Sequence, residues 1–431
     1  MSNVRNLIVN ALVDLEKSQG YSNLVLDSLL KKEALSEQDK AFASRLLYGV
    51  IERKITLDFY ISKLTDKPAK KLTPIVLNSL RVGIYQLEFM DKIPENAAVN
   101  ESVAIVKGSK EQHAAGLVNA VLRNFLRNKP QLPTDTSVYT LSVRYSCPSW
   151  FIEELSDYIG KEETLLFLEN SLQPPPLFLK VNNTLTTAEK LAESLEKYNV
   201  DVSNLNNDCL QVSNVGTLDK ISEFKSGFFH VQDRSSQLCV RALELQENDR
   251  LLDICSAPGG KSCTAAELMN NVGEVVSCDL YEHRAGLVKS NAQKLKLDII
   301  NPRINDATVF NNKLGNFNKI ICDVPCSGFG VIRRKPEIKY KPKSELTNLS
   351  ELQYNILDTT SKYLDVGGRI IYSTCTLRYE ENEAVVTKFL DNHKEFELCE
   401  FYKEYFNGVG HILTPEKCGG DGFFFAVLKR K

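Results

Sequence analysis

The sequence lacks any long apolar run and carries little net charge. No stretch approaches the roughly 20 apolar residues that a membrane-spanning helix needs, so we expect no membrane protein. Residues 1–17 lack the basic, apolar and small-residue order of a signal peptide, and their apolar residues recur at helical spacing. The formal net charge of −2 argues against capture of nucleic acid by the whole surface and leaves room only for a local basic surface. A length of 431 residues predicts two or three domains.

The cysteines also lack the spacing of a disulfide framework or of a metal site. The eleven cysteines are an odd number without a secretion signal, so we expect free thiols in a reducing compartment and a cytoplasmic protein. Two pairs are closely spaced, Cys322 with Cys326 and Cys255 with Cys263, but no histidine lies near them in sequence, so no zinc site or other metal is predicted. Five others are interpreted as small buried apolar residues: Cys147, Cys209, Cys239, Cys399 and Cys418.

Three domains follow from the hydrophobic pattern. Residues 1–140 show helical periodicity throughout and predict a compact all-α domain. Residues 145–235 begin with prolines, a short alternating strand at 177–181 and a helix at 188–198, and predict a small α/β connector. Residues 236–431 alternate short apolar strands with helices, which predicts a doubly wound, mostly parallel sheet with a late antiparallel strand at 423–428.

The turn after the first strand of this last domain is rich in glycine. Asp253–Ser262 reads DICSAPGGKS and opens a helix, and at this place in doubly wound folds glycines let the backbone approach a nucleotide-like ligand. The end of the turn mimics a phosphate-binding P-loop. Cys255 stands where the P-loop requires glycine, and the spaced glycines of a dinucleotide site are absent too.

Two acidic residues follow the next two strands. Asp279 is placed to accept hydrogen bonds from the hydroxyls of a ribose, although an aspartate here is about as often a helix N-cap. Asp306 could meet an adenine amino group, and by itself it is more often a loop carboxylate. A glycine turn and two such acids without a phosphate cradle indicate S-adenosylmethionine as the cofactor.

Cys326 and Cys375 stand just beyond two further strands, at 319–322 and 369–372. The carboxyl ends of parallel strands form the ligand edge of such sheets, so the two thiols converge on one pocket if the strands are neighbours. Carbon 5 of cytosine is a poor nucleophile, and a thiolate added to carbon 6 makes it able to accept a methyl group. Asp323 could share a proton with ring nitrogen N3 and stabilise this adduct.

These motifs resemble the NOL1/NOP2/Sun family of RNA cytosine-5 methyltransferases. The resemblance rests on Asp253–Ser262, on DVPCSG at 323–328 with Gly330, and on Thr374-Cys375, within about the last 200 residues. It implies a Rossmann-like class I methyltransferase fold, with Cys375 as the attacking nucleophile and Cys326 assisting release. Serines at 256 and 262 and Tyr379 depart mildly from the family pattern. The implied cofactor-lining residues are Cys255, Ser256, Ala257, Pro258, Gly259, Gly260, Lys261, Asp279, Asp306 and Asp323.

The first domain sharpens the resemblance. PENAAVNE at 94–101 and GLVNAVLR at 116–123 are similar to a NusB-like RNA-binding domain. Together with the catalytic half, this architecture is similar to bacterial family members that methylate 16S ribosomal RNA, so this RNA is the expected partner of a monomeric enzyme. Transfer RNA, another ribosomal site and a binding protein with a vestigial site remain the alternatives. The intact Cys326, Cys375, Asp323 and Asp279 disfavour the vestigial site.

A basic segment follows the Cys326 loop. Residues 331–343 hold six basic residues and one acidic residue. Such a cluster suits contacts with RNA phosphates, with a tyrosine available for base stacking, whereas a solvated charged surface is the plain alternative. The residues predicted to contact RNA are Arg333, Arg334, Lys335, Lys339 and Tyr340.

Overall fold

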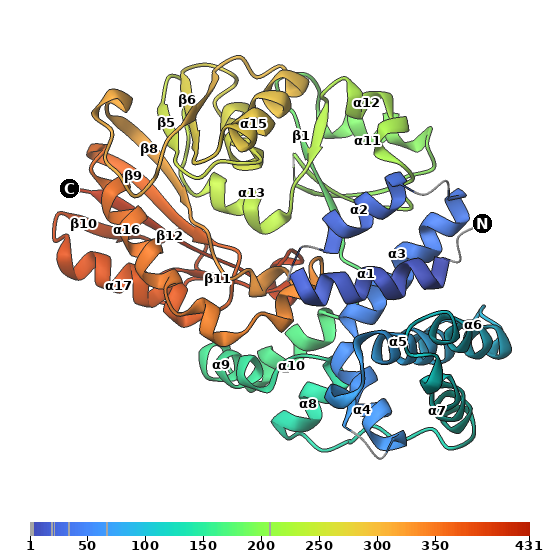
Figure 1. The fold of residues 1–431 in the computed structure, drawn as a ribbon. Coiled ribbons are helices and arrows are strands. Elements are labelled where there is room, and N and C mark those ends of the chain that lie inside the picture. The colour runs from blue at the N-terminus through green and yellow to red at the C-terminus, as the bar shows by residue number, and fades with distance from the viewer. Residues whose placement is uncertain (1–3, 19, 21, 33–34, 66–67, 207) are drawn as a thin grey trace. The chain divides into compact units, whose positions relative to one another are not determined.

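The computed structural model describes residues 4–18, 20, 22–32, 35–65, 68–206 and 208–431. They form two compact units (Figure 1). The first comprises Met1–Leu172 with Arg334–Lys341, and the second comprises Gln173–Arg333 with Pro342–Lys431. Each unit has its own buried core.

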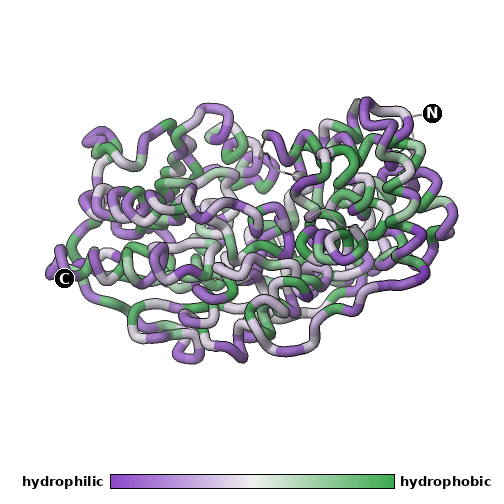
Figure 2. Tube along the Cα trace, turned by 60° about the horizontal axis from the view of Figure 1, so that its bottom comes forward, coloured by the Kyte–Doolittle hydropathy of each residue, from purple (hydrophilic) through white to green (hydrophobic). Residues whose placement is uncertain are grey.

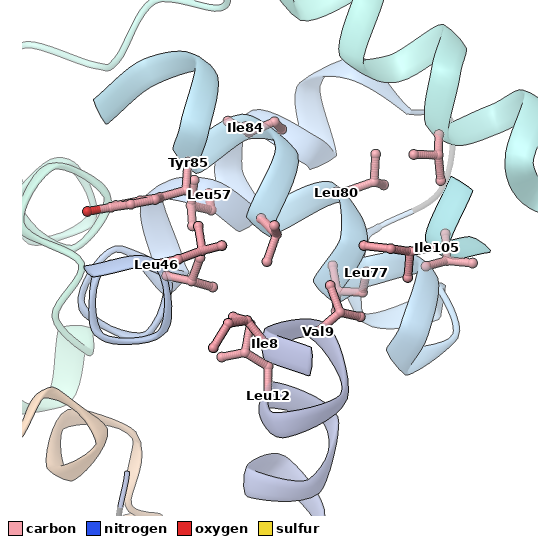
Figure 3. Close-up of a cluster of buried hydrophobic side chains, with 14 of the residues drawn as sticks. Ile8, Val9, Leu12, Leu46, Leu57, Leu77, Leu80, Ile84, Tyr85 and Ile105 are labelled. Carbon is pink, nitrogen blue, oxygen red and sulfur yellow. The ribbon is translucent and has the colours of Figure 1, made fainter. Parts of the chain in front are cut away.

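The first unit is helical, as predicted for residues 1–140. Its helices are α1 (Val4–Ser18), α2 (Ser22–Lys32), α3 (Glu37–Glu52), α4 (Lys54–Leu64), α5 (Pro74–Phe89), α6 (Glu95–Lys107), α7 (Ala115–Arg127), α8 (Val138–Tyr145), α9 (Ser149–Ile159) and α10 (Lys161–Asn170). The unit also includes two helices, α9 and α10, from the stretch predicted as the start of the connector. Of the apolar residues at helical spacing on α7, Val118, Val121, Leu122 and Phe125 are buried, whereas Leu117 is exposed. Figure 3 shows apolar side chains of α1, α3, α4, α5 and α6 gathered in this core.

The second unit begins with a small sheet. Strands β1 (Leu177–Val181), β2 (Asp201–Asn206), β3 (Cys209–Ser213) and β4 (Phe229–Val231) pair antiparallel in the order β2-β3-β1-β4. Helix α11 (Ala188–Glu196) packs its apolar side chains, Leu191 and Leu195, into the core of this sheet. The strand and the helix expected at 177–181 and 188–198 are confirmed, with the helix ending two residues early.

The large sheet is mostly parallel, which confirms the predicted fold class. Its strands are β5 (Arg250–Asp253), β6 (Glu274–Asp279), β7 (Ile300–Ile304), β8 (Phe317–Asp323), β9 (Leu364–Thr374), β10 (Phe396–Cys399), β11 (His411–Leu413) and β12 (Phe423–Arg430). They are ordered β10-β12-β9-β8-β5-β6-β7, with β11 paired to β12. Strands β5 to β9 run parallel, and β12 returns antiparallel to β9. Because β6 and β8 flank β5 on opposite sides, the carboxyl end of β5 is a topological switch point, where such sheets bind ligands.

Helices cover both faces of this sheet because side chains alternate along each strand. Leu251, Ile321 and Ile371 face one core, which contains α13 (Arg234–Arg241), α14 (Gly260–Leu268) and α15 (Glu282–Leu295). Their chain neighbours Leu252, Ile320 and Ile370 face the other core, which contains α16 (Leu349–Ser361) and α17 (Glu383–Asn392). Figure 2 shows the resulting alternation of apolar and hydrophilic stretches along the trace. The short helices α12 (Ser222–Lys225) and α18 (Pro415–Cys418) lie in connections.

A buried charge cluster ties the small sheet to α14. The Lys180 ammonium is fully buried and lies 3.1 Å from Asp208 and 2.8 Å from Glu267 of α14. A buried ammonium is stable only when it is paired and hydrogen-bonded, so this contact holds the helix that follows the glycine turn at a defined place.

Candidate active site

The two predicted cysteines meet at the carboxyl edge of the large sheet. Strands β8 and β9 are parallel neighbours with Asp323 opposite Ser373 in register. Cys326 follows the end of β8 and Cys375 follows the end of β9, and their sulfur atoms lie 3.2 Å apart. Both side chains are partly exposed, whereas Cys147, Cys209, Cys239 and Cys418 are buried as expected and Cys399 is half-buried.

Backbone bonds hold the two cysteine loops together. The Gly330 N–H donates to Cys375 O at 3.0 Å, and the Gly422 N–H donates to Gly330 O at 2.9 Å. A Cβ atom at position 330 would lie 1.9 Å from Gly422 O, so only glycine fits between the two chains. The glycine after the DVPCSG motif is therefore a packing requirement of the cysteine pair.

Asp323 lies beside the thiols and is fully engaged. Its Oδ2 lies 2.8 Å from the Lys261 ammonium, and its Oδ1 accepts a hydrogen bond of 2.7 Å from the Ser373 hydroxyl. Burial, the largest single influence, lowers the pKa of Lys261, but the negative groups around it, Asp323 first and then Cys239 and Cys375, together raise it. Lys261 therefore stays an ammonium and links the glycine turn to the cysteine pocket.

The thiol pair holds its protons unequally. A hydrogen bond with Cys375, followed by burial and repulsion from negative charge on Cys375, raises the pKa of Cys326 well above its ordinary value. At 3.2 Å and an effective dielectric constant of about 20, two negative sulfur atoms would repel each other by about 5 kcal/mol. Only one of the two thiols can therefore ionise readily at a time.

The glycine turn leaves backbone groups for a ligand. Gly259 has φ +106°, and an added Cβ would lie 3.2 Å from Val288, so the turn requires glycine. Gly260 begins α14, whose first N–H groups attract a negatively charged or polar ligand. Ser256 anchors the turn to the end of β6, because its N–H and its hydroxyl both donate hydrogen bonds to Cys278 O.

Asp279 and Asp306 occupy the expected strand ends. Asp279 is buried, accepts a hydrogen bond of 3.2 Å from Ala257 N and lies 3.0 Å from Arg284. It is not the N-cap of α15, which is Tyr281. Asp306 is exposed and accepts bonds from the backbone N–H and hydroxyl of Thr308. These carboxylates and the glycine turn fit an adenosine-containing cofactor, with Asp279 suited to its ribose.

A buried acid beneath the turn was not predicted as a site residue. Asp253, at the end of β5, accepts a hydrogen bond of 2.6 Å from the Ser262 hydroxyl, which itself accepts one of 2.8 Å from Ser277. Burial is the main reason that the pKa of Asp253 rises to about 7. No sequence signal distinguishes this aspartate from the ligand-facing ones, because its burial depends on the packing of α14.

The prediction for the basic segment is wrong at three of its five residues. Lys339 is 1% exposed and its ammonium donates to Glu52 O at 2.8 Å within the helical unit. The Tyr340 hydroxyl donates to Ile51 O at 2.8 Å, and its ring packs against the helical core. In the second unit, the Arg333 side chain is buried within 3.8 Å of Asp421. Arg334 is half-buried and Lys335 is exposed, so these two remain candidates for RNA contact.

Residues that hold the cysteine loops were also missed. Ser373 bonds Asp323, and Glu381 and Asn382 bond the chain around the two thiols. A sequence signal was available, because Glu381 and Asn382 closely follow Tyr379, one of the positions compared with the family pattern. Their contacts depend on how the loops fold.

Comparisons with known proteins identify the family of the chain. Residues 240–429 match the family model "16S rRNA methyltransferase RsmB/F", residues 2–127 match the NusB family, and residues 147–217 match the ferredoxin-like domain of RsmF/B-like methyltransferases. A probable ribosomal RNA small subunit methyltransferase B from Bacillus subtilis is 36% identical over 100% of this chain and 99% of its own length. The ribosomal RNA small subunit methyltransferase B of Proteus mirabilis is 31% identical with the same coverage.

Solved structures show the same fold. The crystal structure of PH0851 has a TM-score of 0.83, with 23% identity, over 100% of this chain and 99% of its own. NSun6 from Pyrococcus horikoshii has a TM-score of 0.60, with 21% identity, over 66% of this chain and 98% of its own.

The fold and the site define a Rossmann-like methyltransferase joined to a NusB domain. The chain belongs to the RsmB/F family of 16S rRNA methyltransferases, within the NOL1/NOP2/Sun group. Its methyl donor is S-adenosylmethionine, as the sequence predicts. Across the described ranges, no helix combines the length and apolar character needed to cross a bilayer, and no cluster of three or more His, Cys, Asp or Glu side chains suits a metal ion.

Proposed function

We propose that this protein methylates carbon 5 of one cytosine in 16S ribosomal RNA through a covalent bond between Cys375 and carbon 6. The observation that carries the proposal is the pair of thiols 3.2 Å apart at the carboxyl ends of β8 and β9, beside Asp323. A simple methyl transfer to nitrogen or oxygen has no need of two adjacent thiols. Relatives named ribosomal RNA small subunit methyltransferase B, similar over the full chain, support the choice of RNA.

The first step is addition of the Cys375 thiolate to carbon 6. The resemblance to the family assigns this role to Cys375, and the raised pKa of Cys326 agrees with it, because a thiol that keeps its proton is the poorer nucleophile. Addition places negative charge on the pyrimidine ring. A proton from water that binds N3 neutralises this charge and leaves again when the ring becomes aromatic. Asp323, fixed by Lys261 and Ser373, accepts a hydrogen bond from N3–H and thereby stabilises the adduct.

Carbon 5 of the adduct is then enamine-like and accepts the methyl group that S-adenosylmethionine supplies. Lys261 and the glycine turn would orient the cofactor, and Asp279 would hold its ribose. Carbon 5 now carries both the methyl group and its original proton, and this proton must leave before the base regains its aromatic ring.

Cys326 completes the cycle. Once Cys375 is bonded to carbon 6 it carries no charge, so the repulsion that raises the pKa of Cys326 disappears. Cys326 can then release its own proton to water, and its thiolate takes the proton from carbon 5 while the electron pair of the bond between Cys375 and carbon 6 leaves on the Cys375 sulfur. The regained proton on Cys326 faces the departing Cys375 thiolate across the 3.2 Å contact and stabilises it.

The target base must leave its stack to reach Cys375. This costs a few kcal/mol, and least where the base is already unpaired. We therefore propose that the target cytosine lies in or beside an irregular segment of the RNA. Arg334 and Lys335 would contact its phosphates.

The test is to trap the adduct. Cys326→Ala and Cys375→Ala variants are incubated with S-adenosylmethionine and a 16S RNA transcript, and protein–RNA complexes that survive denaturation are counted. We expect an adduct with Cys326→Ala, none with Cys375→Ala, and none beyond the parent level with the control Cys399→Ala, whose thiol lies outside the site.

Other results would change the proposal. An adduct only with Cys375→Ala would reverse the roles of the two thiols. Adducts with a transfer RNA transcript and none with 16S RNA would replace the substrate. No adduct with any variant, together with RNA binding by a parent that transfers no methyl group, would favour the binding protein with a vestigial site.

A further inference from the structure

Asn382 binds the chain on both sides of Cys375. Its Oδ1 accepts a hydrogen bond of 2.6 Å from the Thr374 hydroxyl, and its Nδ2 donates one of 3.1 Å to Thr376 O. Asn382 is fully buried, so neither bond is readily replaced by water. One side chain therefore brackets the cysteine at the end of β9.

Glu381 does the same for Cys326, together with Gln353 of α16. Glu381 Oε2 accepts a hydrogen bond of 2.9 Å from Ser327 N, just after the cysteine. Gln353 Nε2 donates to Pro325 O at 2.9 Å, just before it, and to Glu381 Oε2 at 3.0 Å. Glu381 is 1% exposed, and Arg378, 3.0 Å away, balances its charge. The Cys326 loop is thus fixed on both sides as well.

The two bracketing residues are consecutive in the chain. Their Cα atoms are therefore about 3.8 Å apart whatever the loops do. The two loops also touch each other directly, since the hydroxyls of Ser327 and Thr376 lie 2.8 Å apart. One dipeptide therefore holds both cysteine loops, in addition to the backbone bonds between them.

We propose that Glu381 and Asn382 are positioning residues that set the contact between the Cys326 and Cys375 thiols. The inference deepens the proposed function and rests on it for its catalytic meaning. Loss of the hydrogen bonds of either residue would lengthen the 3.2 Å distance between the Cys326 and Cys375 sulfur atoms. It would thereby weaken the hydrogen bond from the Cys326 thiol that stabilises a thiolate on Cys375. Addition to the base and release of the product would both slow, while binding of RNA and cofactor would not change.

The first experiment measures the thiols alone. Asn382→Asp keeps size and sets a carboxylate oxygen against Thr376 O. Glu381→Gln keeps size and replaces the carboxylate oxygen that faces Arg378 by an amide nitrogen, which cannot accept from the guanidinium. Glu380→Gln is the matched control on an exposed neighbour. Each protein is treated with diamide, which oxidises two thiols to a disulfide and is itself reduced to a hydrazine. The peptide joining positions 326 and 375 is then followed by mass spectrometry. Sulfur atoms 3.2 Å apart need to approach by only about 1 Å to reach bonding distance.

We expect the control to form the linked peptide at the parent rate. Glu381→Gln and Asn382→Asp should form the linked peptide about tenfold more slowly, because each variant loses one buried hydrogen bond. The pH midpoint for alkylation of Cys375 by iodoacetamide should rise in both variants. A purely structural role would lower the melting temperature without moving this midpoint.

A second experiment uses RNA. In the Cys326→Ala background, Asn382→Asp should slow formation of the RNA adduct, whereas the KM for RNA of Asn382→Asp alone should match the parent. If Cys326→Ala alone forms no adduct, the proposed function fails, yet the diamide and alkylation results still decide whether the dipeptide sets the thiol contact.

The inference is overturned if folded Glu381→Gln and Asn382→Asp proteins form the linked peptide at the parent rate with an unchanged alkylation midpoint. If these variants do not fold, Thr374→Val replaces them, because it removes one bond to Asn382 at nearly constant volume. It should slow the linkage by a smaller factor, and a parent rate with Thr374→Val would also overturn the inference.

Discussion

Two stretches that follow β8 in the chain differ in how they use their side chains. The Cys326 loop, residues 324–330, is mostly small residues apart from the buried Phe329, and its backbone is bonded to neighbouring strand ends, so its thiol stays at the open edge of the sheet. The basic segment, residues 331–343, carries six positive charges, yet the side chains of Lys339 and Arg333 point inward, to a carbonyl and a carboxylate respectively. A strand end dictates where a side chain points, whereas local charge does not.

The largest expected effect lies in the cysteine loop. Cys326→Ala should lower multiple-turnover methylation by about 10²- to 10⁴-fold, the usual contribution of a proton-transfer group, because the adduct cannot release. Release of tritium from RNA labelled at carbon 5 of cytosine, compared with methyl incorporation, measures this loss. Lys339→Ala is the counterpart in the basic segment and should leave the chemical step unchanged. If Cys326→Ala and Lys339→Ala lowered methylation equally, the cysteine loop and the basic segment would not differ in function.

The next effect concerns stability and separates Asp253 from the site residues around it. Its pKa of about 7 exceeds the ordinary value of 3.8 because the folded protein buries it. The folded state therefore binds a proton that the unfolded state has lost, and its stability falls as the pH rises from about 4 to about 7. The full difference corresponds to about 4 kcal/mol.

Asp253→Asn should remove this loss, since an amide stays neutral and still accepts the Ser262 hydrogen bond. The variant should be less sensitive to pH between 4 and 8 and more stable than the parent at pH 8. Thermal unfolding across this range is the measurement, with Asp306→Asn as an exposed control. The prediction fails if the melting temperatures of the parent and of Asp253→Asn both rise steadily, and by the same amount, up to pH 8.

A smaller effect is expected at the cofactor end of the sheet. Asp279→Ala should weaken S-adenosylmethionine binding by about 10- to 100-fold, the value of one hydrogen bond to a charged group. Calorimetric titration measures the Kd, and Glu282→Ala, on the exposed first turn of α15, serves as control. Unchanged affinity in Asp279→Ala would leave this aspartate only its bonds to Ala257 and Arg284.

The smallest effect lies within the basic segment. If Lys335 contacts a phosphate, Lys335→Ala should lower the slope of log affinity against log salt by about 0.7, the value for one contact with single-stranded RNA. Lys339→Ala should leave the slope unchanged because its ammonium is buried. RNA binding at several salt concentrations distinguishes the two, and a change at Lys339 alone would restore the original prediction for that residue.

Much of the site could be predicted because it follows strand ends. The strands that precede Asp279, Asp323 and Cys375 read as short apolar runs, and parallel strands carry their next residues to one edge. Ser373, Glu381 and Asn382 could not be assigned in the same way. Their roles are hydrogen bonds between loops, and many polar residues of similar sequence context make no such bonds.

The sequence by itself determined the layout of the chain: a helical first domain, a small α/β connector, a parallel sheet, and two cysteines at the ends of its strands. These features depend on hydrophobic period and on turn residues, which are local. Only the tertiary structure decided the 3.2 Å contact of the thiols, the burial of Asp253 and the inward turn of Lys339. Each depends on which distant groups pack nearby, and burial and electrostatic pairing are properties of that packing.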